Sequence, residues 1–191
     1  MFKVIKMDLF RMCKSKYTYI VLVASMLMMF ASVFMTQQDI IYYQQTPSAL
    51  AALQENGDEV NWGIYIGQVS PEWCNGAKIP LPELVSMNIQ SKLLLMFLVA
   101  FIALFAGNEI RTGFIKNIAG QMRYRWELVI GKLLSISIFT VVLLLAAVLA
   151  IMAGSFFFFG YVHIQEVGKF IGYLGMQYLL PVSYTHLTLP T

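Results

Sequence analysis

Charged residues are scarce in this sequence, and their scarcity excludes a surface that faces water throughout. Only 12% of the 191 residues are charged and 59% are hydrophobic, whereas a soluble globular domain carries about 25% charged residues. The few charges are also unevenly spread, since long windows hold none. The composition therefore predicts an integral membrane protein.

Residue combinations that make or break chemical bonds are absent as well. The sequence contains no G-x-x-x-x-G-K-[ST] run to cradle a nucleotide, no H-E-x-x-H, no G-x-S-x-G, and no cluster of cysteines and histidines. His163 stands alone, and we expect it to be a solvated loop residue. These absences predict that the chain is not an enzyme, has no catalytic or metal-binding residues, and binds no cofactor itself.

Long apolar runs are what the sequence has instead. A membrane-spanning helix needs about 20 mostly apolar residues, and residues 17–35, 89–107 and 133–159 each provide such a run. A fourth run covers residues 170–180 and stops before a span is complete. Because lipid obliges the backbone to satisfy its own hydrogen bonds, we predict an all-α membrane protein, a polytopic transmembrane helix bundle.

Basic residues gather on one side of the predicted spans. Five precede the first span and five lie within residues 108–132, whereas residues 36–88 carry six acidic residues and one lysine. Cytoplasmic flanks of membrane proteins are enriched in lysine and arginine. We therefore expect a cytoplasmic N-terminus, a cytoplasmic loop 108–132 and an outer loop 36–88. Cys13 and Cys74 would then lie on opposite sides of the membrane, with no role beyond packing.

The N-terminal residues 1–16 have the pattern of an amphipathic helix. At 3.6 residues per turn, one face is apolar and the opposite face is basic. The apolar face holds Phe2, Ile5, Leu9, Met12 and Cys13, and the basic face holds Lys3, Arg11 and Lys14. A helix of this kind lies in the headgroup layer and leads into a span, so we predict an N-terminal interfacial helix. A plain basic flank is the alternative.

Small residues in the third predicted span favour close helix packing. Ala146, Ala150 and Gly154 recur at four-residue intervals, and small residues let helices approach closely in lipid. Their partner is either another span of this chain, which is the simpler interpretation, or a second subunit. In the outer loop, residues 48–54 favour a short helix, and the loop either shields the outer face or contacts a substrate.

The last ten residues, 182–191, do not continue the fourth apolar run. Residue for residue they match one reading frame of a transposase adapter used in sequencing libraries, and a scar of this kind carries no information on the native fold. We therefore expect this tail to be non-native, and residues 1–180 to form part of a membrane domain whose fourth span is incomplete.

Residues 108–132 form a polar, basic stretch between two predicted spans. They resemble the corresponding loop in the membrane subunits of type-two ABC transporters, mainly exporters. In that family an acidic residue, a basic residue and a Gly-x-Ile-Lys-Asn-like run follow the second span, then a coupling helix and a Gly-Lys-Leu-like entry to the third. The matching residues here are Glu109, Arg111, Gly113 to Asn117, and Gly131 to Leu133. The usual proline and serine before Arg123 are missing.

The resemblance implies a multi-pass permease subunit of the plasma membrane that lacks its later spans. Its partners would be a separate ATP-binding subunit, which binds ATP and Mg, a second permease subunit in a homo- or heterodimer, and the lipid bilayer, with no nucleic acid. Closure of the ATP-binding subunit would push a cytoplasmic coupling helix at residues 112–125. The residues expected to couple to that partner are Glu109, Arg111, Thr112, Gly113, Phe114, Ile115, Lys116, Asn117, Ile118, Arg123 and Arg125.

Two other classes of membrane protein compete with the permease interpretation. One is a non-transport anchor or sensor whose outer loop binds a ligand. The other is a membrane-embedded enzyme, which the missing catalytic groups disfavour. Substrate and direction of transport are not encoded in any motif of the sequence.

Overall fold

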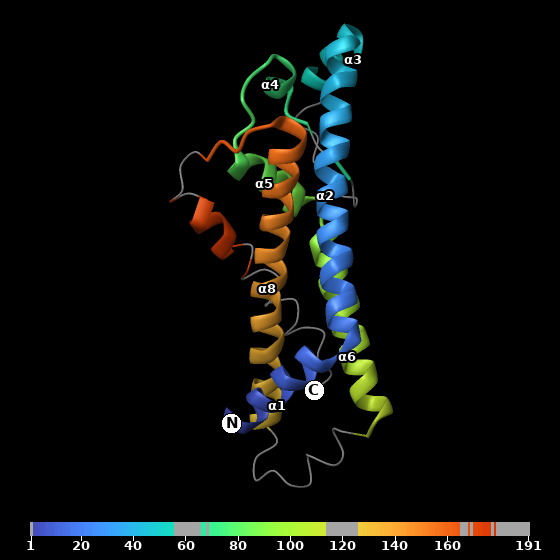
Figure 1. Ribbon diagram of the computed structural model, residues 1–191, viewed down its shortest axis with the longest axis vertical. Helices are drawn as coiled ribbons and strands as arrows, with labels where there is room; N and C mark the ends of the chain where they lie inside the picture. The colour runs from blue at the N-terminus through green and yellow to red at the C-terminus, as the bar shows by residue number, and fades with distance from the viewer. Residues whose placement is uncertain are drawn as a thin grey trace.

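A computed structural model describes residues 2–55, 66–67, 69–113, 126–164, 168, 170–176 and 178 of the chain. These residues are helical apart from turns and one isolated β-bridge. Three helices dominate: α2 (Lys16–Gln45), α6 (Leu93–Arg111) and α8 (Trp126–Phe159). All three are long and apolar enough to cross a membrane. Helix α2 packs against both α8 and α6, and the three run along the long axis of the molecule (Figure 1).

The helix ends differ from the predicted span ends because apolarity and helicity stop at different residues. Helix α2 continues to Gln45, so residues 36–45 are helical and do not belong to a loop. Helix α6 begins at Leu93 and not at residue 89, because Lys92 adopts a left-handed conformation with φ 61°, which interrupts a right-handed helix. Helix α8 begins at Trp126, seven residues before the predicted start at 133.

Three short helices lie at one end of the bundle: α3 (Pro47–Glu55), α4 (Pro71–Cys74) and α5 (Leu81–Gln90). Helix α3 confirms the short helix predicted over residues 48–54, while α5 was not predicted. The turn after α8 is fixed to this group, since the backbone N–H of Leu81 donates to the carbonyl of His163 at 2.8 Å. His163 is half-buried in this turn, so its side chain is partly exposed to solvent.

The contact between α2 and α8 depends on a glycine. A Cβ atom added to Gly154 would lie 3.1 Å from the Cβ of Val33, which is closer than side chains normally pack. Ala146 and Ala150 are buried on the same helix. At Gly154, therefore, the small-residue pattern serves packing within the chain, as the simpler interpretation predicted.

Aromatic side chains join α6 to α8 in the interior. The fully buried ring of Phe101 stacks on Phe139 with 3.7 Å between centroids, and Phe105 stacks on Phe101. On the outside of the bundle, large apolar side chains are exposed instead, including Leu27 (64%) and Phe157 (75%). Apolar patches of this extent are unusual on soluble proteins and suit a surface that faces lipid.

Helix α1 (Phe2–Lys14) lies across the other end of the bundle and turns into α2 at Ser15 (Figure 1). Ile5 and Met12 are buried, as predicted for the apolar face. Cys13 is exposed, so its assignment to that face was wrong. Among the described side chains of α1, one acidic side chain is also buried: Asp8 is 1% exposed.

The predicted fourth span is described only in part. Residues 170–176 are helical, and the hydroxyl of Tyr173 donates to the carbonyl of Ser86 in α5 at 3.1 Å. The end of that run and the tail 182–191 lie outside the described residues. Among the described residues, the helices that qualify as candidate spans are α2, α6 and α8.

Candidate functional site

Four charged side chains from three helices meet in the interior at the α1 end of the bundle. Nη1 of Arg11 in α1 donates to Oε1 of Glu109 in α6 at 2.9 Å, and Nζ of Lys132 in α8 donates to the other oxygen, Oε2. Nη1 of Arg11 also lies 3.7 Å from Oδ1 of Asp8. We call Asp8, Arg11, Glu109 and Lys132 the charge cluster.

Glu109 is at the centre of the charge cluster because of its position on α6. It follows Phe101 and Phe105 at four-residue intervals, so all three lie on one face of the helix, and all three are buried. Only 1% of Glu109 is exposed. A buried carboxylate in the last turn of a helix opposes the helix dipole, whose C-terminal end is negative. The two cations therefore offset both the burial and the dipole.

Arg11 is held at the charge cluster by more than its bond to Glu109. Its guanidinium carbon lies 5.8 Å from the centroid of the Phe105 ring, within the range of a cation–π interaction. Arginine presents five N–H donors in a planar fork. A single side chain of α1 thus contacts two successive turns of α6.

Asp8 is the least satisfied member of the charge cluster. Neither carboxylate oxygen has a hydrogen-bond partner among the described residues. Burial raises the pKa of the Asp8 carboxyl above its ordinary value, the Glu109 carboxylate raises it further, and the charges of Lys132 and Arg11 lower it. With all four groups ionised the charge cluster is neutral, and a proton on Asp8 would leave it with one positive charge.

The arrangement connects three helices through ion pairs. No group of three potential metal ligands occurs among the described residues. Removing one partner from a buried ion pair costs about 3–5 kcal/mol, because the other charge stays buried without compensation. The ends of α1, α6 and α8 should therefore move as one body.

The loop residues predicted from the sequence divide into two groups. Glu109 is buried, Arg111 and Thr112 are exposed, and Gly113 is half-buried. Seven others lie outside the described residues: Phe114, Ile115, Lys116, Asn117, Ile118, Arg123 and Arg125. The coupling role of these residues stays a prediction.

The two described residues of the predicted coupling helix close α6. Thr112 is its C-cap, and Gly113 follows with φ 66°, the left-handed conformation that glycine adopts at helix ends. The N–H groups of Thr112 and Gly113 donate to the carbonyls of Asn108 and Ile110. The prediction that a coupling helix starts at residue 112 is therefore wrong, and residues 114–125 lie outside the described residues.

Asp8, Arg11 and Lys132 were not recognised from the sequence as members of a charge cluster with Glu109. One signal was present for Asp8, which lies three residues after Ile5 and four before Met12, on the apolar face of a helix otherwise rich in lysine and arginine. An acidic residue in that position needs a buried cation. Lys132 gave no such signal, because it has the pattern of an ordinary basic flank.

Comparison of the chain with protein-family models, with curated proteins and with solved structures found no match. Function is therefore inferred from the charge cluster, from the distribution of charge and from the resemblance of the loop motif.

Proposed function

We propose that the chain is a membrane-spanning permease subunit of an ATP-driven transporter of the type-two ABC class, acting as an exporter. The observation that carries the proposal is the pair of bonds from Glu109 to Arg11 and Lys132. These bonds connect α1 with the end of α6 and the start of α8, which flank the predicted coupling loop. Transfer of force from a cytoplasmic partner requires such a connection.

The distribution of charge supports a cytoplasmic position for the charge cluster. Helix α1, the start of α2 and the end of α6 lie at the same end of the bundle as the cluster, and they carry Lys6, Lys14, Lys16 and Arg111. Cytoplasmic flanks are rich in lysine and arginine, so α1 lies along the inner face of the plasma membrane as an interfacial helix. The N-terminus is then cytoplasmic, and α3, α4 and α5 lie on the outer side.

In the proposed mechanism the chain transmits force from its partner, and no covalent bond is made or broken within it. ATP and Mg bind in the separate ATP-binding subunit, whose closure presses on the loop between Gly113 and Trp126. Both ends of that loop are fixed, one by the α6 cap at Gly113 and the other by α8. Because Lys132 is bonded to Glu109, displacement of the start of α8 also displaces the end of α6. The bond between Arg11 and Glu109 extends the displacement to α1. The movement of these helices switches access across the bilayer.

Co-purification tests whether this chain has an ATP-binding partner. The full chain would be co-expressed with the ATP-binding subunit encoded next to its gene, and the complex would be isolated through a tag on the ATPase. We expect co-purification, and we expect Lys116→Ala with Asn117→Ala to weaken it. If the two proteins never co-purify and these changes have no effect, the chain is a membrane anchor or sensor and the proposal fails.

Stimulation of ATP hydrolysis tests the charge cluster separately from partner binding. Glu109→Gln keeps the size of the side chain but removes its charge. We expect this variant to lose most of the stimulation of ATP hydrolysis by the permease, and co-purification of the same variant reports partner binding separately. Glu72→Gln is the matched control, since Glu72 is exposed at the opposite end of the bundle.

A further inference from the structure

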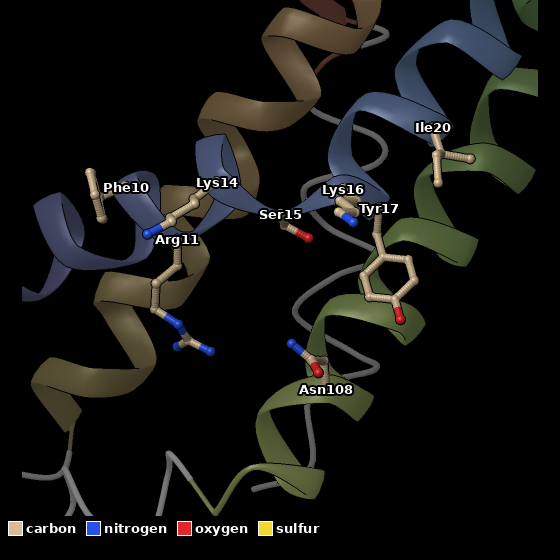
Figure 2. Close-up of a pocket in the computed structure, with 8 residues that line it drawn as sticks. All are labelled: Phe10, Arg11, Lys14, Ser15, Lys16, Tyr17, Ile20 and Asn108. Atoms are coloured by element: carbon tan, nitrogen blue, oxygen red, sulfur yellow. The ribbon is translucent and has the colours of Figure 1, made fainter.

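A cavity of about 470 Å³ lies at the elbow where α1 turns into α2 (Figure 2). It is open to the outside and is bordered by the end of α1, the start of α2 and the end of α6. The residues that line it are Phe10, Arg11, Lys14, Ser15, Lys16, Tyr17, Ile20 and Asn108. Its volume is within the range of small-molecule sites, which measure about 300–1,000 Å³.

The polar part of the lining is suited to an anion. Three of the eight residues are cations, Arg11, Lys14 and Lys16, and none is acidic. Figure 2 shows the side chains of Arg11 and Tyr17 extending from the elbow on either side of Asn108. Guanidinium, ammonium, hydroxyl and amide groups are all donors to phosphate oxygens.

The cations at the elbow exceed what the charge cluster needs. The two carboxylates of Asp8 and Glu109 equal in number the two cations, Arg11 and Lys132, with which they form ion pairs. Lys14 and Lys16 add two further positive charges beside that neutral group. An anion in the cavity would complete the charge balance of the elbow.

The apolar part of the lining indicates that the anion carries a hydrocarbon chain. Phe10 is 66% exposed and Ile20 is 63% exposed, and both line the same cavity as the cations. Ile20 lies in the first turns of α2, a candidate membrane span. A soluble phosphate ion would gain nothing from these two side chains, whereas a phospholipid would place its first methylene groups against them.

We propose that the elbow cavity binds the phosphate headgroup of an anionic phospholipid from the leaflet that contains α1. The lysines select a net negative headgroup, because the choline of a zwitterionic lipid would bring a positive charge toward them. The proposal requires the helices in a membrane but no ATP-binding partner, so it is independent of the proposed transport function.

Lipid binding to the purified full chain tests the proposal. The protein would be mixed with vesicles of phosphatidylglycerol or of phosphatidylcholine, and retained lipid would be counted by native mass spectrometry. We expect retention of phosphatidylglycerol only. Because one basic residue near an anionic surface changes binding by about fivefold, we expect Lys14→Gln and Lys16→Gln each to weaken retention by about that factor, and Lys14→Arg to preserve it.

Two controls make the result decisive. Lys6 is an exposed lysine of α1 that does not line the cavity, so Lys6→Gln should retain the lipid normally. An equal loss in Lys6→Gln and Lys14→Gln would mean diffuse attraction to a basic surface and would overturn the proposal.

Inorganic phosphate is the second control, added to the protein in phosphatidylcholine. If it binds as tightly as phosphatidylglycerol and Lys14→Gln abolishes that binding, the site belongs to a soluble anion and not to a lipid.

Discussion

Arg11 donates a hydrogen bond of 2.9 Å to Glu109 across 98 residues of sequence. This bond joins a short N-terminal helix to the end of a candidate membrane span. Because Glu109 also accepts from Lys132, one carboxylate connects three helices. Two predictions test this connection, and two test packing elsewhere in the bundle.

Replacement of Glu109 should destabilise the bundle strongly. Glu109→Ala leaves the charges of Arg11 and Lys132 without their buried partner, so the free energy of unfolding should fall by about 3–5 kcal/mol. Unfolding of the purified protein in mixed detergent micelles, followed by circular dichroism, measures the change. Lys6→Ala is the control and should change the free energy by less than about 0.5 kcal/mol, since Lys6 is exposed. Equal effects of the two variants would contradict a buried charge cluster.

Replacement of Asp8, unlike replacement of Glu109, should not lower the free energy of unfolding at neutral pH. Because the pKa of Asp8 is raised in the folded protein, the folded state binds the proton more tightly than the unfolded state. The ionised Asp8 carboxylate therefore destabilises the fold fully above the pKa of the folded state. This destabilisation shrinks as pH falls from the folded-state pKa to the unfolded-state pKa, and it is absent below both. We expect Asp8→Asn to be at least as stable as the native sequence at neutral pH and to lose this part of the pH dependence.

A pH series of unfolding measurements checks the Asp8 prediction. Glu109, Arg11 and Lys132 face Asp8 and remain in the variant, so the comparison isolates the Asp8 carboxyl. The difference in stability between Asp8→Asn and the native sequence should shrink as pH falls below the folded pKa. A variant that is less stable at neutral pH, by an amount that grows with pH, would mean that the ionised carboxylate stabilises the fold.

Substitution of Gly154 by a larger residue should disturb the packing of α2 against α8. A side chain at this position meets Val33, and overpacking of this kind costs about 1–3 kcal/mol. We expect Gly154→Leu to lower the free energy of unfolding by that amount and Val33→Ala to restore part of it. Gly107→Ala is the matched control in α6, because a Cβ atom there meets nothing within 4 Å. Independent effects of the Gly154 and Val33 substitutions would rule out the contact.

The two cysteines should differ in reactivity. Cys13 is exposed and Cys74 is buried, and burial raises the pKa of the Cys74 thiol, which lowers its thiolate fraction. In detergent, a maleimide should modify Cys13 more than about tenfold faster than Cys74. Mass spectrometry of single variants, Cys13→Ser and Cys74→Ser, measures both rates, and denaturation should remove the difference. Similar rates in the folded protein would contradict the packing of α4.

The sequence was sufficient to predict the helical class and the approximate places of the three long helices, because uncharged apolar runs of about 20 residues are typical of membrane-spanning helices. It was insufficient for their ends. Helix α6 continues past the apolar run through Glu109 to Arg111 and stops where Gly113 turns left-handed. Its start at Leu93 depends on Lys92, a residue type that gives no turn signal.

The charge cluster was harder to predict than the fold for a physical reason. The bonds of Glu109 reach residues 98 and 23 positions away, and no local pattern encodes such distances. Composition marks which side of the membrane basic residues occupy, but it does not pair them with acids. Only the packing of α1 against the bundle brings Arg11 to Glu109.

The most direct test of the proposed transport function is the side of the membrane on which the loop between α6 and α8 lies. Lys116→Cys would be introduced with Cys13→Ser and Cys74→Ser, and labelled with a membrane-impermeant maleimide in intact cells and in inverted membrane vesicles. We expect labelling in inverted vesicles alone, since a cytoplasmic ATPase must reach this loop. Labelling in intact cells would place the loop outside, where no ATP-driven partner could act on it.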